Sequence, residues 1–250
     1  MANPFYDPGA QRADKVRRLF ATIAARYDLI NDLQSLGLHR RWKRRLVALA
    51  APVPNTPCLD LCCGTGDVGL ALERRGARAV GLDFCLPMLE VARRRHGTQF
   101  SGCVRFVCGD VLRLPFLDAS FEVVTISYGL RNLASVQNGL VEIGRVLRSG
   151  GRALVLDFGK PRNGAWRAAY FTYLGWCVPV LGWMVCGDAQ AYGYILESLR
   201  HYPAQDGVAE LMRGLGFADV RVINLLGGIM SLTVGKKILS RTGERHSPGA

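Results

Sequence analysis

The sequence lacks the features that mark several classes of protein. Its eight cysteines form no Cys-x-x-Cys pair and its four histidines form no cluster, so no metal site is indicated. No segment repeats at a fixed period, which argues against solenoids and propellers. A composition of 49% hydrophobic and 21% charged residues excludes disordered, collagenous and coiled-coil chains. The 250 residues are instead enough to bury a sizeable core.

A secretory signal is also missing from the first fifteen residues, which contain no apolar run of the required kind. Several cysteines lie inside apolar, strand-like segments. Reduced, buried cysteines are typical of proteins of the cytoplasm, where disulfides are rare. The expected location is therefore the cytoplasm.

Acidic residues are scarce relative to basic ones: 20 Asp and Glu stand against 32 Lys and Arg, a formal net charge of +12. Residues 1–50 contain ten of the basic and four of the acidic side chains. Such a surplus favours a polyanionic partner, namely a nucleic acid, an anionic membrane surface or an acidic substrate. The alternative is a solvated basic face without a partner.

One uncharged segment, residues 168–187, has the length of a transmembrane helix. Pro179 and three glycines interrupt it, and no second span exists. A hydrophobic lid or an interfacial helix is favoured over a span, because Trp and Tyr at both ends suit a membrane interface. A helix packed in the core is the other alternative.

A proline-rich connector, residues 51–57, divides the chain. Before it, hydrophobic periodicity predicts helices over 14–31 and 39–50, which form a helical cap within residues 1–51. After it, apolar strands alternate with helices, which indicates a parallel sheet covered on both faces. The strands are predicted at 58–61, 77–83, 104–110, 121–128 and 152–158, and the helices at 68–75, 86–95 and 134–147.

The last two predicted strands, 220–226 and 228–237, are separated by a glycine turn and can pair as an antiparallel hairpin. The expected fold class is α/β: a Rossmann-like, mostly parallel twisted sheet with helices on both faces and this hairpin at its end. The main domain is expected over 52–240, with the lid inserted at about 162–200. Residues 241–250 are expected to form a disordered tail.

A glycine-rich turn follows the first predicted strand. Gly64 and Gly66 belong to a Gly-x-Gly-x-x-Gly pattern that opens a helix, as in sites for nucleotide-type ligands. Asp83 ends the next strand, where a carboxylate accepts the ribose hydroxyls of an adenosine. Asp110 ends the third strand and faces the ligand crevice, where it can accept from an adenine amine while the amide of Val111 donates to the ring.

Charge separates the two cofactors that suit this turn. NAD places a pyrophosphate there, which the carboxylates of Asp60 and Asp67 would repel. S-adenosylmethionine places a sulfonium and an ammonium there, which the same carboxylates would bind, so it is the favoured cofactor. Each of two carboxylates also has a purely structural interpretation. Asp67 can be a residue favoured in the first turn of a helix, and Asp110 can be a turn-forming residue.

Nine segments carry a resemblance to known families. Four resemble the successive motifs of class I S-adenosylmethionine-dependent methyltransferases: LDLCCGTGD (59–67), GLDFCLPML (81–89), GDVLRLPF (109–116) and LRSGGRALVLDF (147–158). Five resemble the ubiquinone/menaquinone biosynthesis C-methyltransferases: FATIAARYDLINDLQSLGLHRRWKR (20–44), SYGLRNL (127–133), LDFGKP (156–161), YGYILESLRHYP (192–203) and LLGGIMSLTVGKK (225–237). The resemblance extends from about Lys15 to Lys237.

This resemblance implies methylation of a ring carbon of a polyprenylated quinol, either demethylmenaquinol, 2-methoxy-6-polyprenyl-1,4-benzoquinol or both. It implies cofactor roles for Thr65, Gly66, Asp83, Asp110, Val111 and Ser127. The chain departs from the family pattern at 148–151, at 157–161 and at Cys62–Cys63, and the last change affects the packing behind the methionine moiety.

A quinol ring becomes nucleophilic when a hydroxyl loses its proton. Arg131 is expected to stabilise the resulting phenolate, directly or through a water, because a guanidinium is a poor base. Asn132 is expected to bind a ring oxygen. His39 is a candidate base, and a helix-start residue is its other interpretation. The candidates for the acceptor pocket are Tyr27, Tyr192, Tyr194 and Arg200.

Three other functions stay open: methylation of another small phenolic or lipid acceptor, methylation of RNA, and NAD-dependent dehydrogenation. The net charge suits RNA, but no RNA-binding module and no Asn-Pro-Pro-Tyr box is visible. The expected partners are therefore the quinol and an anionic membrane, contacted peripherally from its inner face, and not nucleic acid. A homodimer is a further option.

Overall fold

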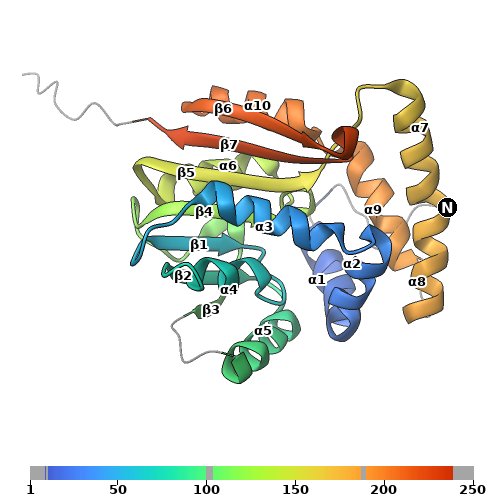
Figure 1. Cartoon of the computed structure of the whole chain (residues 1–250), viewed down its shortest axis with the longest axis horizontal. Coiled ribbons are helices and arrows are strands. Elements are labelled where there is room, and N and C mark those ends of the chain that lie inside the picture. The colour runs from blue at the N-terminus through green and yellow to red at the C-terminus, as the bar shows by residue number, and fades with distance from the viewer. Residues whose placement is uncertain (1–8, 10, 100–103, 187–189, 239–250) are drawn as a thin grey trace, which may run out of the picture.

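The structure is a computed structural model that describes residues 9, 11–99, 104–186 and 190–238 (Figure 1). The tail predicted over 241–250 lies outside these residues. Strands and helices alternate along most of the chain, as the hydrophobic pattern predicts. The fold is α/β, with a mostly parallel sheet, an antiparallel hairpin at its end and helices on both faces.

The sheet has seven strands in the order β3-β2-β1-β4-β5-β7-β6. The first five pair in parallel, and β7 runs antiparallel to both β5 and β6. The strands are β1 (Pro57–Leu61), β2 (Arg78–Asp83), β3 (Arg105–Cys108), β4 (Phe121–Ser127), β5 (Leu147–Phe158), β6 (Phe217–Leu225) and β7 (Met230–Lys237). Strand β5 begins five residues earlier than predicted, because Leu147 pairs with Phe121 through a bulge.

Helices cover the sheet on both sides. Helices α3 (Leu38–Ala50) and α4 (Asp67–Glu73) lie in front of it in Figure 1, and α6 (Val136–Val146) and α10 (Ala204–Gly214) lie behind. Helix α5 (Leu86–Gln99) packs against β2 and β3. Strand β1 has no exposed residue, as expected for a central strand covered on both faces.

The helical cap comprises α1 (Arg12–Ile23), α2 (Tyr27–Ser35) and α3. The single helix predicted over 14–31 is broken, because a 3-10 turn at Ala24–Arg26 separates α1 from α2. The break lets α1 bury its own apolar face while α2 turns toward the lid. Gly37 then reverses the chain with a φ of 74°, a conformation that favours glycine, and α3 begins.

The lid comprises α7 (Gly164–Thr172), a π-helical turn (Tyr173–Cys177), α8 (Val178–Cys186) and α9 (Gln190–His201). These helices lie together at one end of the sheet, and α2 packs against α8 (Figure 1). The inner face of the segment is buried and its outer face is exposed, so it is in part a core element. In the part of the chain that the structure describes, each helix is too short or too polar to cross a membrane.

Candidate active site

A cavity lies at the carboxyl ends of the parallel strands. It adjoins the junction of β1 with β4, where the strand order reverses and where ligands of open α/β sheets bind. We name it the strand-end cavity. Of the residues predicted to bind the cofactor, five line it: Gly64, Asp83, Asp110, Val111 and Ser127.

Asp83 organises the glycine turn. One carboxylate oxygen accepts the Gly64 amide at 2.8 Å, and the other accepts the Cys85 amide at 2.9 Å. Burial raises the pKa of Asp83, while these backbone bonds favour its ionised form. A carboxylate held in this way keeps further lone pairs for a ligand. Asp110 accepts the Leu112 amide at 2.9 Å and begins the turn that contains Val111.

Gly66 does not line the strand-end cavity. Its φ of 86° is costly for other residues, and a Cβ atom there would lie 3.1 Å from the ring of Phe106. Gly66 therefore shapes the turn through its backbone. Thr65 is also absent from the cavity wall, and its hydroxyl donates a hydrogen bond to Asp28 of the cap at 2.9 Å.

Asp60 and Asp67 are not at the cavity wall either, which corrects the charge argument from the sequence. Asp60 is fully buried beneath the turn, where it accepts from the Thr125 hydroxyl and the Gly69 amide. Burial raises its pKa to about 7. Asp67 forms ion pairs with Lys43 and Arg95, at 2.8 and 2.7 Å. Both carboxylates are thus occupied by groups of the protein.

The ion pairs of Asp67 belong to a larger network that we name the clasp. Arg95 also contacts the Asp28 carboxylate at 3.1 Å and the Thr65 carbonyl at 3.0 Å. Asp28 and Lys43 come from the cap, whereas the other three residues come from the main domain. The clasp therefore holds the cap over the strand-end cavity, to which the cap contributes Ala13, Phe20 and Tyr27 as wall.

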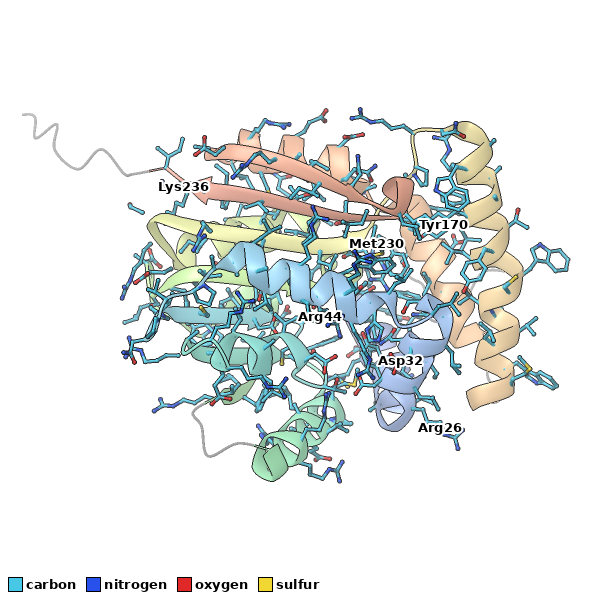
Figure 2. The ribbon with its side chains drawn as sticks, viewed as in Figure 1. Arg26, Asp32, Arg44, Tyr170, Met230 and Lys236 are labelled. Atoms are coloured by element: carbon cyan, nitrogen blue, oxygen red, sulfur yellow. The ribbon has the colours of Figure 1, made fainter. Side chains whose placement is uncertain are left out.

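A second cavity lies between the cap, the lid and the β6–β7 turn, and we name it the apolar cavity. Most of its lining is hydrophobic or aromatic. Tyr170 of α7 and Met230 of β7 both contribute, and Figure 2 shows them near one another at the lid end of the sheet. Such a lining suits a hydrophobic ligand.

Tyr128 separates the two cavities. It lines both of them and also a small third cavity that contains Tyr27 and Arg131. Its φ of 60° is unusual for a residue with a Cβ, and the ring packs edge-on against Phe158. Its hydroxyl is buried and has no hydrogen-bond partner among the described residues. Tyr128 is therefore a wall that the two cavities share.

Arg131 is bound more firmly than the sequence indicates. It is buried, its guanidinium contacts the Asp157 carboxylate at 3.1 Å, and its amide donates to the same carboxyl group. The guanidinium lies 4.5 Å from the centre of the Phe158 ring. Asp157 neutralises the positive charge of the Arg131 guanidinium. The main role of Arg131 is therefore structural, as the partner of Asp157 at the edge of the small cavity.

The other predicted residues are placed as follows. Asn132 lines the strand-end cavity, and its side-chain oxygen accepts from the Tyr194 hydroxyl at 3.1 Å, so Tyr194 holds Asn132. Tyr27 lines the strand-end and small cavities. The side chain of Tyr192 lies outside the described part of the chain. Arg200 is exposed, pairs with Glu197 and reaches none of the cavities named above.

His39 is buried at the start of α3 and lines the apolar cavity. Its Nε2 lies 2.8 Å from the Asp32 carboxylate, which the Arg40 guanidinium also holds. The hydrogen bond from Arg40 lowers the pKa of Asp32 to about 2. The sequence interpretation did not include Asp32, nor Tyr128 or the clasp. One available signal was the four-residue spacing of Asp28 and Asp32, which places both on one side of a helix.

Comparisons with known proteins agree with this geometry. Residues 9–237 match the ubiE/COQ5 methyltransferase family. A ubiquinone/menaquinone biosynthesis C-methyltransferase UbiE of Ruegeria sp. (strain TM1040) is 37% identical over 92% of this chain and 94% of its own. The enzyme of that name from Stutzerimonas stutzeri (strain A1501) is 40% identical over 92% of this chain and 91% of its own.

Solved structures share the fold at low identity. The [4+2]-cyclase SpnF has a TM-score of 0.67 and 15% identity, over 90% of this chain and 96% of its own. A possible histamine N-methyltransferase from Thermotoga maritima has a TM-score of 0.62 and 17% identity, over 88% and 98%. Within the described residues, no group of acidic, histidine or cysteine side chains is arranged to hold a metal. The chain belongs to the ubiE/COQ5 methyltransferase family and is an S-adenosylmethionine-dependent C-methyltransferase.

Proposed function

We propose that this enzyme methylates a ring carbon of a polyprenylated quinol, with demethylmenaquinol and 2-methoxy-6-polyprenyl-1,4-benzoquinol as the two candidate acceptors. The names of the relatives, which refer to ubiquinone and menaquinone biosynthesis, support this class of substrate. One observation carries the proposal: a cavity with two carboxylates and an apolar cavity share Tyr128 as a wall.

The strand-end cavity suits the adenosine half of the cofactor. Asp83 would accept the ribose hydroxyls, and Asp110 with the Val111 amide would bind adenine, because these groups line the cavity in the right order along β2 and β3. Tyr27 and Phe20 of the cap would exclude water from the reacting end. S-adenosylmethionine, when bound, supplies an electrophilic methyl group on a sulfonium.

The apolar cavity suits the acceptor. A quinol ring needs to approach Tyr128 from the side opposite the adenosine, and the prenyl units that follow it need apolar surroundings. Trp42, Tyr173 and Leu174 provide such surroundings toward the lid. In this arrangement the two reactants lie on either side of Tyr128. Holding both reactants in a fixed geometry lowers the entropic cost of a two-substrate reaction.

The outer face of the lid provides a membrane contact in this proposal. Trp176 is 74% exposed, Trp183 63% and Met184 61%, and Leu36 of the cap is 88% exposed beside the apolar cavity. Exposed apolar groups of this size indicate an interaction surface, and tryptophan suits the headgroup region. Peripheral attachment to an anionic membrane would bring the prenyl tail to the cavity.

Transfer of labelled methyl from S-adenosylmethionine to each demethylated quinol tests the proposed reaction. We expect labelled menaquinol, labelled benzoquinol product or both, and far less transfer to a short phenol that lacks a prenyl tail. Turnover that is equal on untailed phenols and on quinols would contradict the substrate assignment. Absence of transfer to any quinol would contradict the proposed function.

Vesicle flotation tests the membrane contact. We expect recovery with vesicles that contain anionic lipid, and a clear loss for the double variant Trp176→Ser/Trp183→Ser. The matched control is Trp166→Ser, since Trp166 is less exposed and lies on α7 at the cavity wall. Equal recovery of the wild-type protein with and without vesicles would contradict the contact.

A further inference from the structure

His39 and Asp32 form a pair whose protonation follows from geometry. The Asp32 carboxylate accepts two hydrogen bonds from the Arg40 guanidinium, at 2.6 and 2.7 Å. It also lies 2.8 Å from the Nε2 atom of His39. Because an ionised carboxylate only accepts hydrogen bonds, Nε2 carries the proton of the neutral imidazole. The lone pair of the ring is therefore on Nδ1.

The Nδ1 atom has no hydrogen-bond partner in the part of the chain that the structure describes, although it is buried. Two other buried polar atoms without a partner belong to residues of the same apolar cavity, the Gln34 side-chain oxygen and the Tyr128 hydroxyl. Buried polar atoms are normally paired, so three unpaired ones on residues that line one cavity are available to a polar ligand. A helix-start role for His39 would explain Nε2 but not the unpaired Nδ1.

We infer that His39 is the proton acceptor of the reaction, with Asp32 as its positioning residue. This rests on the proposed function, because the proton comes from a hydroxyl of the quinol. The O–H bond breaks, an N–H bond forms at Nδ1, and the electron pair stays with the oxygen and enriches the neighbouring ring carbon. The imidazolium is stabilised by Asp32 through Nε2–H.

The proton balance closes within one turnover. After the ring carbon has gained its methyl group from the sulfonium, it loses its own hydrogen as a proton to water, and His39 returns its proton to the oxygen. One proton therefore leaves per methyl group transferred. Arg131 is unsuited to this role, because its guanidinium keeps its charge and is already paired with Asp157.

Charged groups on several elements act on His39. Burial lowers its pKa and Asp32 of α2 opposes this, while Lys43 of α3 lowers it and Asp67 of α4 raises it. Arg40 of α3 acts through Asp32, and the Tyr128 side chain after β4 lines the same cavity. The net effect is a pKa below the ordinary value, so the imidazole is neutral and able to accept a proton at neutral pH.

The test compares His39→Gln and Asp32→Asn with Arg44→Gln, a control that removes an exposed charge from the same helix. We expect kcat to fall about 100-fold or more for His39→Gln and about tenfold for Asp32→Asn, with the cofactor Kd within about twofold of wild type. The acidic limb of the wild-type pH–rate profile should vanish in His39→Gln. Arg44→Gln should retain wild-type kcat and the acidic limb.

A second substrate separates a chemical role from a structural one. A fluorinated quinol, whose hydroxyl is more acidic, should recover much of the lost kcat in His39→Gln but change the wild-type kcat little. Loss of turnover on both quinols alike, or retention of the acidic limb in His39→Gln, would overturn the inference. If His39→Gln does not fold, the Asp32→Asn profile decides: an unchanged kcat and limb would overturn it. A wild-type enzyme inactive on every quinol would instead refute the proposed function.

Discussion

The strand-end cavity and the apolar cavity are built from different kinds of structure. Gly64, Asp83 and Ser127 lie at the ends of strands whose ladders fix the backbone. The apolar cavity lies between the cap, the lid and the β6–β7 turn, which pack mainly through side chains. Packed helices can slide, whereas a hydrogen-bonded sheet does not. The cofactor site is thus set mainly by the sheet, and the acceptor site mainly by packed helices and a turn.

The largest effect is expected for the sheet-bound site. Asp83→Ala removes the acceptor of the Gly64 and Cys85 amides and, in the proposed function, the partner of the ribose. Each of the two ribose hydroxyls would donate a hydrogen bond to this charged group, worth about 1.5–3 kcal/mol, so we expect cofactor affinity to fall at least about 100-fold. Calorimetry with S-adenosylmethionine measures this. Glu90→Gln on α5 is the control, and equal affinities for both variants would show that Asp83 has no role in binding.

A similarly large effect, on stability rather than binding, is expected at Arg131. Arg131→Ala leaves Asp157 buried without its cation, which costs about 3–5 kcal/mol. The double variant Arg131→Ala/Asp157→Asn should regain part of this loss. Urea unfolding of both variants measures the difference, and turnover is measured below their unfolding transitions. If the double variant were less stable than the single one, the buried pair would not be the cause.

The clasp offers a way to loosen the cap while leaving the sheet intact. Arg95→Gln removes contacts with both Asp28 and Asp67. Partly buried pairs of this kind contribute about 1 kcal/mol, so we expect cofactor dissociation to accelerate about fivefold. Stopped-flow displacement measures the rate. The control is Arg93→Gln, two residues earlier on α5 and on another face of the helix, which should leave the dissociation rate unchanged. An equal acceleration in Arg93→Gln would contradict a specific role for the clasp.

The smallest effect concerns acid stability. The pKa of Asp32 is about 2 in the folded protein, below its ordinary value of 3.8. A lowered pKa adds stability that is fully present above the ordinary value and is lost as pH falls toward 2. The wild type should therefore lose slightly more stability than Asp32→Asn between pH 5 and pH 3. Urea midpoints at these two values measure the difference, and parallel losses would rule out the contribution.

The sequence predicts the order of strands and helices well, because apolar periodicity reports burial directly. It does not predict the break in the first helix, since Ala24–Arg26 are compatible with a continuous helix and tertiary packing decides. It also misplaces Asp60 and Asp67. A motif shows that a carboxylate is near the turn, but not whether it faces the ligand, an amide below it or a cation on another helix.

The catalytic candidates show the same limit. Arg131 looks free in the sequence, and only the fold brings Asp157 from the end of β5 to neutralise it. The His39–Asp32 contact spans seven residues across a turn whose geometry depends on Gly37. The division into a cap over 1–51 and a main domain over 52–240, the absence of nucleic acid and the homodimer remain predictions.

Helix α2 contributes to both cavities, with Tyr27 in the wall of one and Asn31 and Gln34 in the wall of the other. A rigid helix cannot shift toward one ligand without changing the site of the second. Binding of the cofactor and of the acceptor is therefore expected to be thermodynamically linked. If the acceptor changes the affinity for the cofactor by some factor, the cofactor changes the affinity for the acceptor by the same factor. The affinity for the methyl donor would then differ between the free enzyme and the enzyme that already holds its acceptor.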